Sequence, residues 1–152
     1  MKKSIFILLL IAFRINASAQ FVARLQLKDS IAGICDMANV YALFPGFGGQ
    51  VEAHCPVSKE DILNRLNTEV TYLKANPKFK GKGMIGIIIN CKGKVVQCKM
   101  DNTTGNTELD AQIEAVFNSL GEWKAGKLND LEVDSSRLFS FKIKKGVISF
   151  DY

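Results

Sequence analysis

Two short apolar runs rich in β-branched residues stand in the middle of the chain. The first covers residues 85–89 and the second residues 95–100, with Asn-Cys-Lys-Gly at positions 90–93 between them. This pattern predicts a β-hairpin from Gly83 to Met100, in which Gly93 supplies the positive φ of a tight turn. Because a lone hairpin is only marginally stable in water, a further strand and a helix must cover its apolar face.

Amphipathic helices are predicted on both sides of the hairpin. Apolar residues recur at helical spacing between residues 59 and 74. Ser58 is placed to cap the start of this helix, and Asp61 completes a capping box. A second apolar stripe predicts a helix over residues 108–120, for which Asn106 or Thr107 can be the cap.

Alternating apolar and polar residues predict a strand over residues 133–143 with one buried face. Residues 147–152 fit a last short strand. Near the other end, residues 20–27 suit a short edge strand, whereas residues 31–43 fit either a helix or a strand. The order of elements predicts an α+β fold, a three-stranded antiparallel sheet packed against two helices, with an N-terminal extension.

The first residues have the pattern of a signal peptide. A basic start precedes an apolar run at residues 5–11, and small residues at 17–19 fit a cleavage site after Ala19. The run is shorter than the roughly 20 residues of a membrane-spanning helix, and no later segment is long enough. We therefore divide the chain into a signal peptide (1–19), an extension and linker (20–57) and a domain (58–152), and expect a periplasmic or secreted protein whose mature chain has no membrane span.

The composition fits one globular domain, and the net charge bears on whether the partner is a nucleic acid. The 152 residues carry a net charge of +5, which falls to +2 when residues 1–19, with three basic residues and no acid, are removed. A nucleic-acid-binding protein concentrates Lys and Arg on one face. An excess of only two basic residues over acidic ones in the mature chain argues against a nucleic-acid partner.

All four cysteines follow the predicted cleavage site: Cys35, Cys55, Cys91 and Cys98. Disulfides persist in exported proteins, so two bridges can form, and the three possible connectivities stay open. Cys91 and Cys98 are poor partners, because they lie about 13 Å apart at about 3.3 Å per residue and bridged Cα atoms lie within about 7 Å. A bridge from the sheet to Cys35 or Cys55 would tie the N-terminal segment to the domain.

The sequence gives little support to catalysis or to a bound cofactor. His54 stands beside Cys55, and a cysteine nucleophile needs a base within hydrogen-bond reach. Adjacent residues usually point apart, however, and no CxxC-type spacing supports a metal site. Glycines at 46–49 lack the pattern of a phosphate-binding loop. We expect neither a metal nor a cofactor, and no enzymatic activity.

Six motifs in the same order resemble the C-terminal domain of the TonB energy-transducing proteins. They are PGFGGQVEA at 45–53 (the family's FPGG-x-x-A element), Tyr72 at its spacing before Gly83, Gly93-Lys94-Val95 (G-x-V), Leu109-Asp110 with Ala115-Val116 (LD-x-x-A-x-x-A-V), Trp123 with Gly126 (W-x-P-G), and the closing strand at 141–143. The resemblance covers residues 44–150. Leu73 and Ala125 stand where the family has proline, and the family's membrane anchor and proline-rich spacer are missing. The chain therefore resembles the binding end alone.

The resemblance implies a non-catalytic periplasmic protein-binding module. In the family the closing strand lies at a sheet edge and receives an extended segment of an outer-membrane transporter, because an edge offers unpaired N–H and C=O groups. The implied partner is a TonB-dependent outer-membrane transporter or another periplasmic protein. The residues of this chain that correspond to the family's peptide-binding strand are Ser136, Arg137, Leu138, Phe139, Ser140, Phe141, Lys142 and Ile143.

Two alternatives remain open at this stage. The first is an exported structural or interaction protein with no transporter role, whose edge is covered by its own residues 21–27 and held by disulfides. Lys142, Lys144 and Lys145 would fit such a guarded edge, since lysine discourages strand addition. The second is an enzyme that uses Cys55 and His54.

Overall fold

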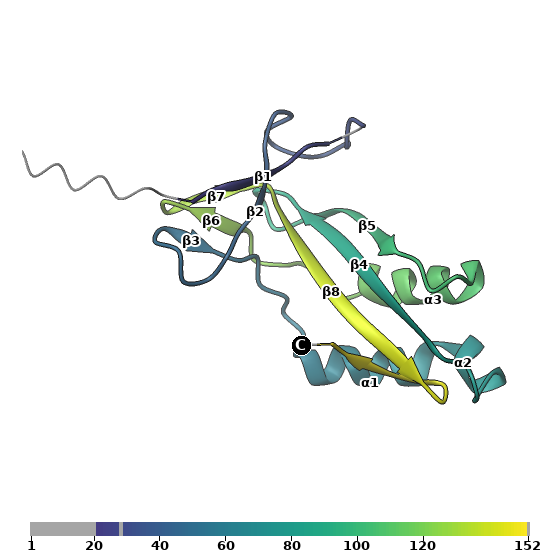
Figure 1. Ribbon diagram of the computed structural model, residues 1–152. Helices are drawn as coiled ribbons and strands as arrows, with labels where there is room; N and C mark the ends of the chain where they lie inside the picture. The colour runs from purple at the N-terminus through teal and green to yellow at the C-terminus, as the bar shows by residue number, and fades with distance from the viewer. Residues whose placement is uncertain (1–20, 28, 152) are drawn as a thin grey trace, which may run out of the picture.

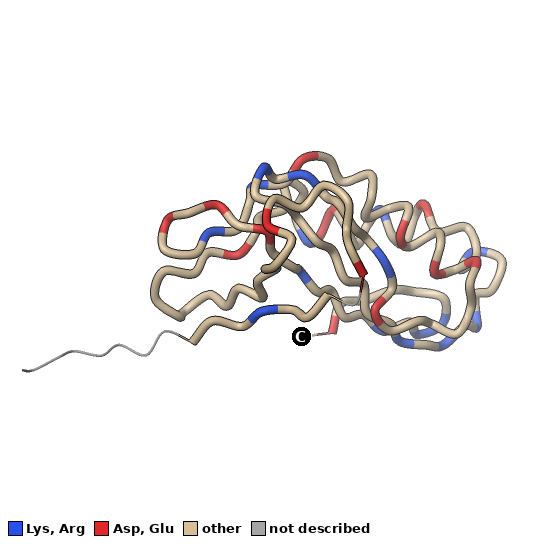
Figure 2. Tube along the Cα trace, turned by 90° about the horizontal axis from the view of Figure 1, so that it is seen from above, with Lys and Arg blue, Asp and Glu red and all other residues tan. Residues whose placement is uncertain are grey.

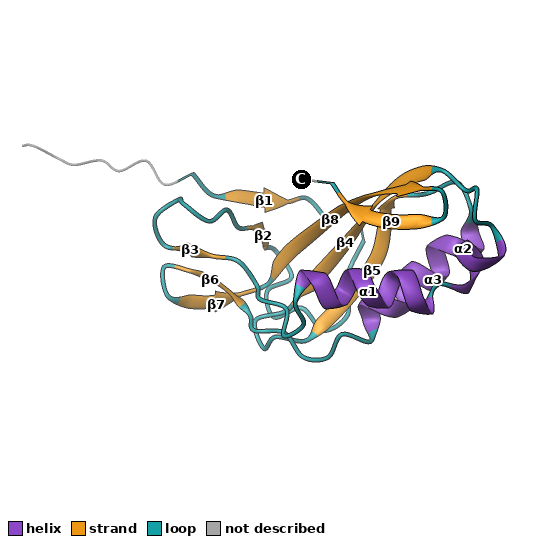
Figure 3. Cartoon of the chain, turned by 90° about the horizontal axis from the view of Figure 1, so that it is seen from below, coloured by secondary structure: helices purple, strands orange, loops and turns teal. Residues whose placement is uncertain are grey.

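The computed structural model describes residues 21–27 and 29–151, so the predicted signal peptide lies outside the described residues. The elements form two sheets, and the helices cover one face of the larger sheet (Figures 1 and 3). In chain order they are β1 (Ala23–Leu25), β2 (Val40–Ala42), β3 (Gln50–Val51), α1 (Lys59–Glu69), α2 (Thr71–Ala75), β4 (Gly81–Ile89), β5 (Val95–Asn102), α3 (Thr107–Asn118), β6 (Gly126–Leu128), β7 (Leu131–Val133), β8 (Ser135–Lys144) and β9 (Val147–Phe150).

The large sheet has the order β1-β2-β8-β4-β5, and β9 also pairs with β8. The predicted hairpin is confirmed as the antiparallel pair β4 and β5, and Gly93 in its turn has a φ of 78°. The predicted α+β class is confirmed, but the three-stranded sheet is wrong, since β1, β2 and β9 extend the β5-β4-β8 centre to six strands. β1 and β9 lie within the short strands predicted over residues 20–27 and 147–152, but their places in the sheet were not predicted. β2 has three residues, too few to give a periodic pattern.

A second, three-stranded sheet with the order β3-β6-β7 was not predicted. The pairing of Leu128 with Leu131 leaves a two-residue loop between β6 and β7. Asn129 and Asp130 in this loop have φ values of 50° and 65°, the left-handed conformation that two-residue hairpin turns require.

The predicted helix over residues 59–74 is two helices, because Val70 has a ψ of 94° and ends α1 before α2 begins. Over residues 21–27 and 29–151 the structure thus has three helices rather than the predicted two. The cap at Ser58 is confirmed, since the Asp61 N–H donates to Ser58 Oγ over 3.1 Å. The Asp61 carboxylate accepts from the Ser58 hydroxyl over 2.8 Å, whereas in a capping box it would accept from the main-chain N–H of that residue. Asn106 caps α3 as expected. None of the described helices combines the length and the apolar character needed to cross a bilayer.

The core lies between the helices and one face of the large sheet. Alternate residues of β4 and β8 point into it and are almost fully buried: Ile85, Ile87, Ile89, Phe139, Phe141 and Ile143. On β8 the opposite face carries polar residues and the exposed Leu138, whereas on β4 it carries the buried Ile88. The single buried face predicted for the closing strand is therefore confirmed.

Candidate functional site

The predicted peptide-binding residues lie on β8, which has neighbours on both of its sides. β4 pairs with one side along residues 135–143. On the other side, β2 pairs with Ser135 and Ser136, and β9 pairs with Phe141–Lys144. The expectation that residues 136–143 follow an open sheet edge is therefore wrong at both ends of this stretch (Figure 1).

Between β2 and β9, residues 137–140 form what we call the β8 window. Within the described ranges, no strand pairs with the outer side of this window. The Asp151 N–H donates to the Ser140 carbonyl over 2.9 Å, so the main-chain polar groups of Ser140 face outward. In an antiparallel strand every second residue turns its N–H and C=O to the same side. The N–H and C=O of Leu138 therefore face outward as well.

A cavity of about 260 Å³ lies beside the β8 window, on the helix side of the sheet. Arg137 and Phe139 contribute both to the window and to the cavity wall, and Arg137 forms an ion pair with Glu52 across it. The Arg137 guanidinium also lies 5.8 Å from the centre of the Phe139 ring, within the range of a cation–π contact. Trp123 is another lining residue; its indole N–H is buried and has no acceptor among the described residues.

Cys55 and His54 line the same cavity, but the structure does not activate the thiol. Cys55 is half-buried and unbridged, and desolvation raises its pKa, although the Val57 amide and the charge of Arg137 act the other way. A raised pKa keeps the thiol protonated at neutral pH, whereas a nucleophilic cysteine needs a lowered one. The main chain of His54 pairs with Lys124, and its side chain is exposed.

One disulfide joins the extension to the hairpin turn. Cys35 and Cys91 are bridged with their Cα atoms 6.0 Å apart, which confirms the predicted tie and is consistent with an exported protein. The second bridge does not form, because Cys55 lies at the cavity and Cys98 in the core. Burial, with a smaller contribution from Glu114, raises the pKa of the Cys98 thiol to about 12.

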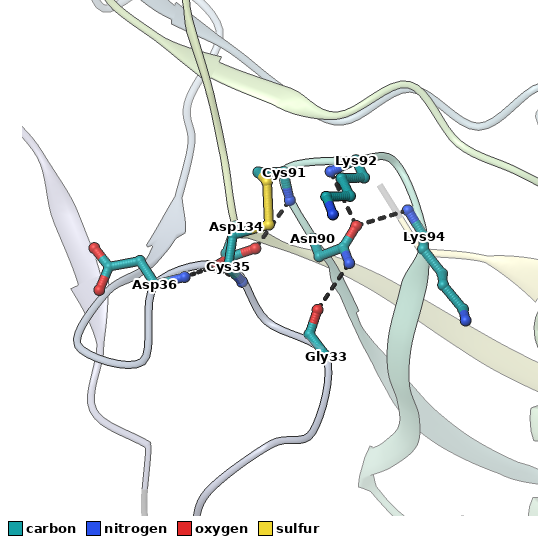
Figure 4. Close-up of a disulfide and its surroundings, with 8 residues drawn as sticks. All are labelled: Gly33, Cys35, Asp36, Asn90, Cys91, Lys92, Lys94 and Asp134. Carbon is teal, nitrogen blue, oxygen red and sulfur yellow. Dashed lines mark hydrogen bonds between the residues drawn. A yellow bond between two sulfur atoms is a disulfide. The ribbon is translucent and has the colours of Figure 1, made fainter.

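Asp134 organises the surroundings of this disulfide (Figure 4). Its carboxylate is 1% exposed and accepts hydrogen bonds from the amides of Cys35 and Asp36, both over 2.7 Å, and of Cys91 over 2.9 Å. The carboxylate and the two sulfurs lie within 4.8 Å of one another, a spacing that suits metal ligands. Because the sulfurs are joined to each other, they cannot bind a metal as thiolates, and the carboxylate serves the backbone amides instead.

A second link lies next to the disulfide. The side-chain amide of Asn90 donates to the Gly33 carbonyl over 2.8 Å, so the hairpin turn holds the extension at two places (Figure 4). The sequence carries no signal for Asp134 or Asn90 in these roles, because an acid or an amide in a turn is most often solvated. The expectation that residues 21–27 cover β8 is wrong in detail, since β2 contacts β8 and β1 lies outside β2.

Residues that carry the resemblance to TonB domains contact each other. A Cβ at Gly93 would lie 2.0 Å from the Trp123 carbonyl oxygen, and the Trp123 N–H donates to the Gly93 carbonyl over 3.0 Å. A Cβ at Gly83 would lie 2.6 Å from the ring of Phe141. The close approach of neighbouring atoms thus requires glycine at both positions. This packing requirement explains the two glycines whether or not the chain is related to TonB domains.

Comparisons with protein-family models, with curated proteins and with solved structures give no significant match. The resemblance to TonB C-terminal domains therefore stays a prediction that depends on the six sequence motifs.

Proposed function

We propose that the protein is a non-catalytic, exported protein-binding module that takes a short extended segment of its partner at the β8 window. The observation that carries this proposal is the pair of outward-facing main-chain groups of Leu138, which lie between β2 and β9. An added strand would complete the ladder there. The implied partner is the segment of a TonB-dependent transporter, or of another periplasmic protein, that the sequence resemblance suggests.

The cavity supports the proposal, because it lies where a side chain of the added segment would point. Phe139 and Ile62 offer apolar surface, and Arg137 and Glu52 offer one charge of each sign. So few groups would give a small interface of the weak and transient class.

A partner strand that pairs with all of residues 136–143 requires neighbouring strands of the sheet to move away from β8. The outer side of Ser136 is paired with Ala42, and that of Phe141 with Phe150. A partner segment that covers the whole predicted site must therefore displace both β2 and β9. We expect the short window to be the site in the disulfide-bonded protein.

A second candidate is a self-capped structural or interaction protein with no transporter role. It is favoured by a specific observation: β2 and β9 already occupy most of the outer side of β8, and the Cys35–Cys91 disulfide holds the extension that carries β2. Under this alternative the window is only a gap between two strands.

Amide hydrogen exchange of the isotopically labelled protein, measured residue by residue, distinguishes the two candidates. We expect the Leu138 amide to exchange rapidly in the free protein and to become protected when an extended peptide from a transporter N-terminus is added. The matched control is the same peptide N-methylated at alternate residues, which keeps its side chains but cannot form the ladder. Slow exchange of Leu138 without any peptide would favour self-capping, and unchanged amide signals over residues 136–143 would contradict peptide binding.

A further inference from the structure

Three phenylalanines form an exposed cluster at the end of the molecule away from the helices. Phe21, Phe44 and Phe47 have ring centroids 5.4–6.4 Å apart, and their side chains remain 53%, 42% and 49% exposed. Phe21 precedes β1, and the other two lie on the loop that joins β2 to β3 (Figure 3). We call these three residues the phenylalanine cluster. Contiguous exposed apolar surface on a folded protein commonly marks an interaction site.

A buried glutamine fixes the cluster. The Gln50 side chain is 7% exposed; its carbonyl oxygen accepts from the Phe44 amide over 3.1 Å, and its amide group donates to the Phe21 carbonyl. Both chain segments are thereby held at one polar side chain. The main chain that carries Phe21 and Phe44 is therefore fixed before binding, so less backbone entropy is lost when the cluster binds.

The loop between β2 and β3 is suited to an apolar environment. Residues 43–49 read Leu-Phe-Pro-Gly-Phe-Gly-Gly and contain neither a charge nor a polar side chain, so this loop is tan throughout in Figure 2. Part of its main chain is already paired: Phe47 donates to Phe44, Gln50 donates to Phe47, and Asn129 donates to Gly49. Paired main-chain groups lower the cost of leaving water.

The size of the cluster argues for a lipid surface rather than a second copy of the chain. A phenylalanine side chain offers roughly 200 Å², so three half-exposed rings present about 300 Å². A stable protein interface buries about 800 Å² on each partner. Shallow insertion of apolar side chains into a bilayer needs no matching surface and no minimum area of this kind.

From these observations we infer that the phenylalanine cluster inserts into the interfacial region of a lipid bilayer and holds the exported protein at a membrane surface. The loop carries no charge, so attraction to charged lipids is not needed, and neutral lipids suffice. The inference is independent of the β8 window, which lies on another part of the large sheet.

The test is co-sedimentation of the exported protein with vesicles of phosphatidylcholine. We expect binding that does not change between low and high salt, because burial of apolar surface is not screened. Phe44→Ser and Phe47→Ser should each weaken binding about tenfold, given roughly 100 Å² of lost apolar surface that is partly inserted. The matched control is Val147→Ser, which removes a similarly exposed apolar side chain, 58% exposed, at the start of β9.

A second readout keeps the inference testable if a serine variant is poorly folded. Phe47→Trp adds an indole to the cluster, and the fluorescence emission of this indole should shift to the blue when vesicles are added. The emission of Trp123 should stay constant, because Trp123 is buried. Absence of vesicle binding by the wild-type protein, or equal binding by the phenylalanine variants, would overturn the inference. Self-association without lipid that the phenylalanine variants abolish would overturn it in favour of a second copy.

Discussion

The body of the domain and the N-terminal extension share one sheet, but different forces stabilise them. The body, made of β4, β5, β8, β9 and the helices, surrounds a continuous apolar core; among the described residues this core includes none before Ala53. The extension over residues 21–52 keeps most of its side chains exposed. It is held by the disulfide, by the bond from Asn90 to Gly33, and by Asp134, which accepts from the amides of Cys35 and Asp36. Short pairings of β2 with β8 and of β3 with β6 add to these links, and only Val40 and Leu43 are buried apolar side chains among the described residues of this segment.

This difference bears on access to β8. Apolar burial is cooperative and spread over many side chains, so loss of one contact weakens the whole body. The extension depends on a few localised links, and loss of one of them can release it while the body stays folded. Release of the extension would uncover the outer side of Ser136, beside the β8 window.

The largest effect is expected in the body, from Phe141→Ala. Phe141 is 1% exposed and packs over Gly83, so truncation should lower the free energy of unfolding by about 4 kcal/mol. Urea denaturation measures this change. Leu138→Ala, at the exposed position three residues earlier, is the control and should cost under about 0.5 kcal/mol; a similar cost for both variants would contradict the statement that burial of apolar side chains against the core stabilises the body.

Loss of the disulfide should act mainly on the extension. We expect the Cys35→Ser/Cys91→Ser variant to lose about 3 kcal/mol of stability, since the bridge closes a long loop with a sequence separation of 56. Its clearest sign is hydrogen exchange: the Tyr41 amide, bonded to the Asp134 carbonyl over 2.9 Å, should exchange much faster. The amides of Ile85 and Ile87 in β4 should keep their protection.

The control for this experiment is Cys55→Ser, which removes a thiol that is not bridged. It should leave the exchange of Tyr41 unchanged. Faster exchange of β2 and β4 to the same extent in the disulfide variant would mean that the extension and the body unfold as one unit, and would remove the basis of the comparison.

The same division explains how much of the fold could be predicted. The hairpin, α3 and β8 have long periodic patterns, because each buries one face against the same core, and all three were placed correctly. The break at Val70 was missed because the apolar spacing continues across it. β2 has three residues and pairs in parallel with β8, a contact fixed by distant residues, so no local pattern could indicate it.

The candidate site was predicted in the same uneven way. Alternation placed residues 136–143 on a strand with the correct buried face, but a strand pattern contains no information about its neighbours, so β2 and β9 were not foreseen beside it. The distance between Cys91 and Cys98 correctly excluded one bridge. Cys98 pairs with Ile87 and therefore faces the core, which left it unable to reach another cysteine.

An intermediate effect is expected from Asp134→Asn, which replaces the carboxylate that accepts hydrogen bonds from main-chain amides of the extension and the hairpin turn. The new side chain has a nitrogen in place of one oxygen, so a donor would face backbone amides that need an acceptor. We expect a loss of about 2 kcal/mol, within the range for a buried polar group left unsatisfied. Equilibrium denaturation measures it, with Glu132→Gln on the exposed side of β7 as a near-neutral control. No loss would show that the carboxylate is not needed to hold the extension.

The smallest effect is a pH dependence that belongs to the body. Burial raises the pKa of Cys98 from 9.0 to about 12 in the folded protein, whereas the unfolded chain exposes an ordinary thiol. Below pH 9 the thiol is neutral in both states, so its contribution to stability is fully present; between pH 9 and 12 only the unfolded chain loses the proton, and stability falls. At pH 10 the loss should reach about 1 kcal/mol.

The comparison that isolates this effect is the stability difference between wild type and Cys98→Ala, measured at pH 8 and at pH 10. Lysines and tyrosines titrate in the same range, but they titrate in both proteins and cancel in the difference. We expect the wild-type advantage at pH 8 to shrink by about 1 kcal/mol at pH 10. Cys55→Ala should show a smaller change, because Cys55 is only half-buried. A difference that stays constant with pH would mean that Cys98 ionises as readily in the folded protein as in the unfolded chain, and hence that water reaches the core from β5.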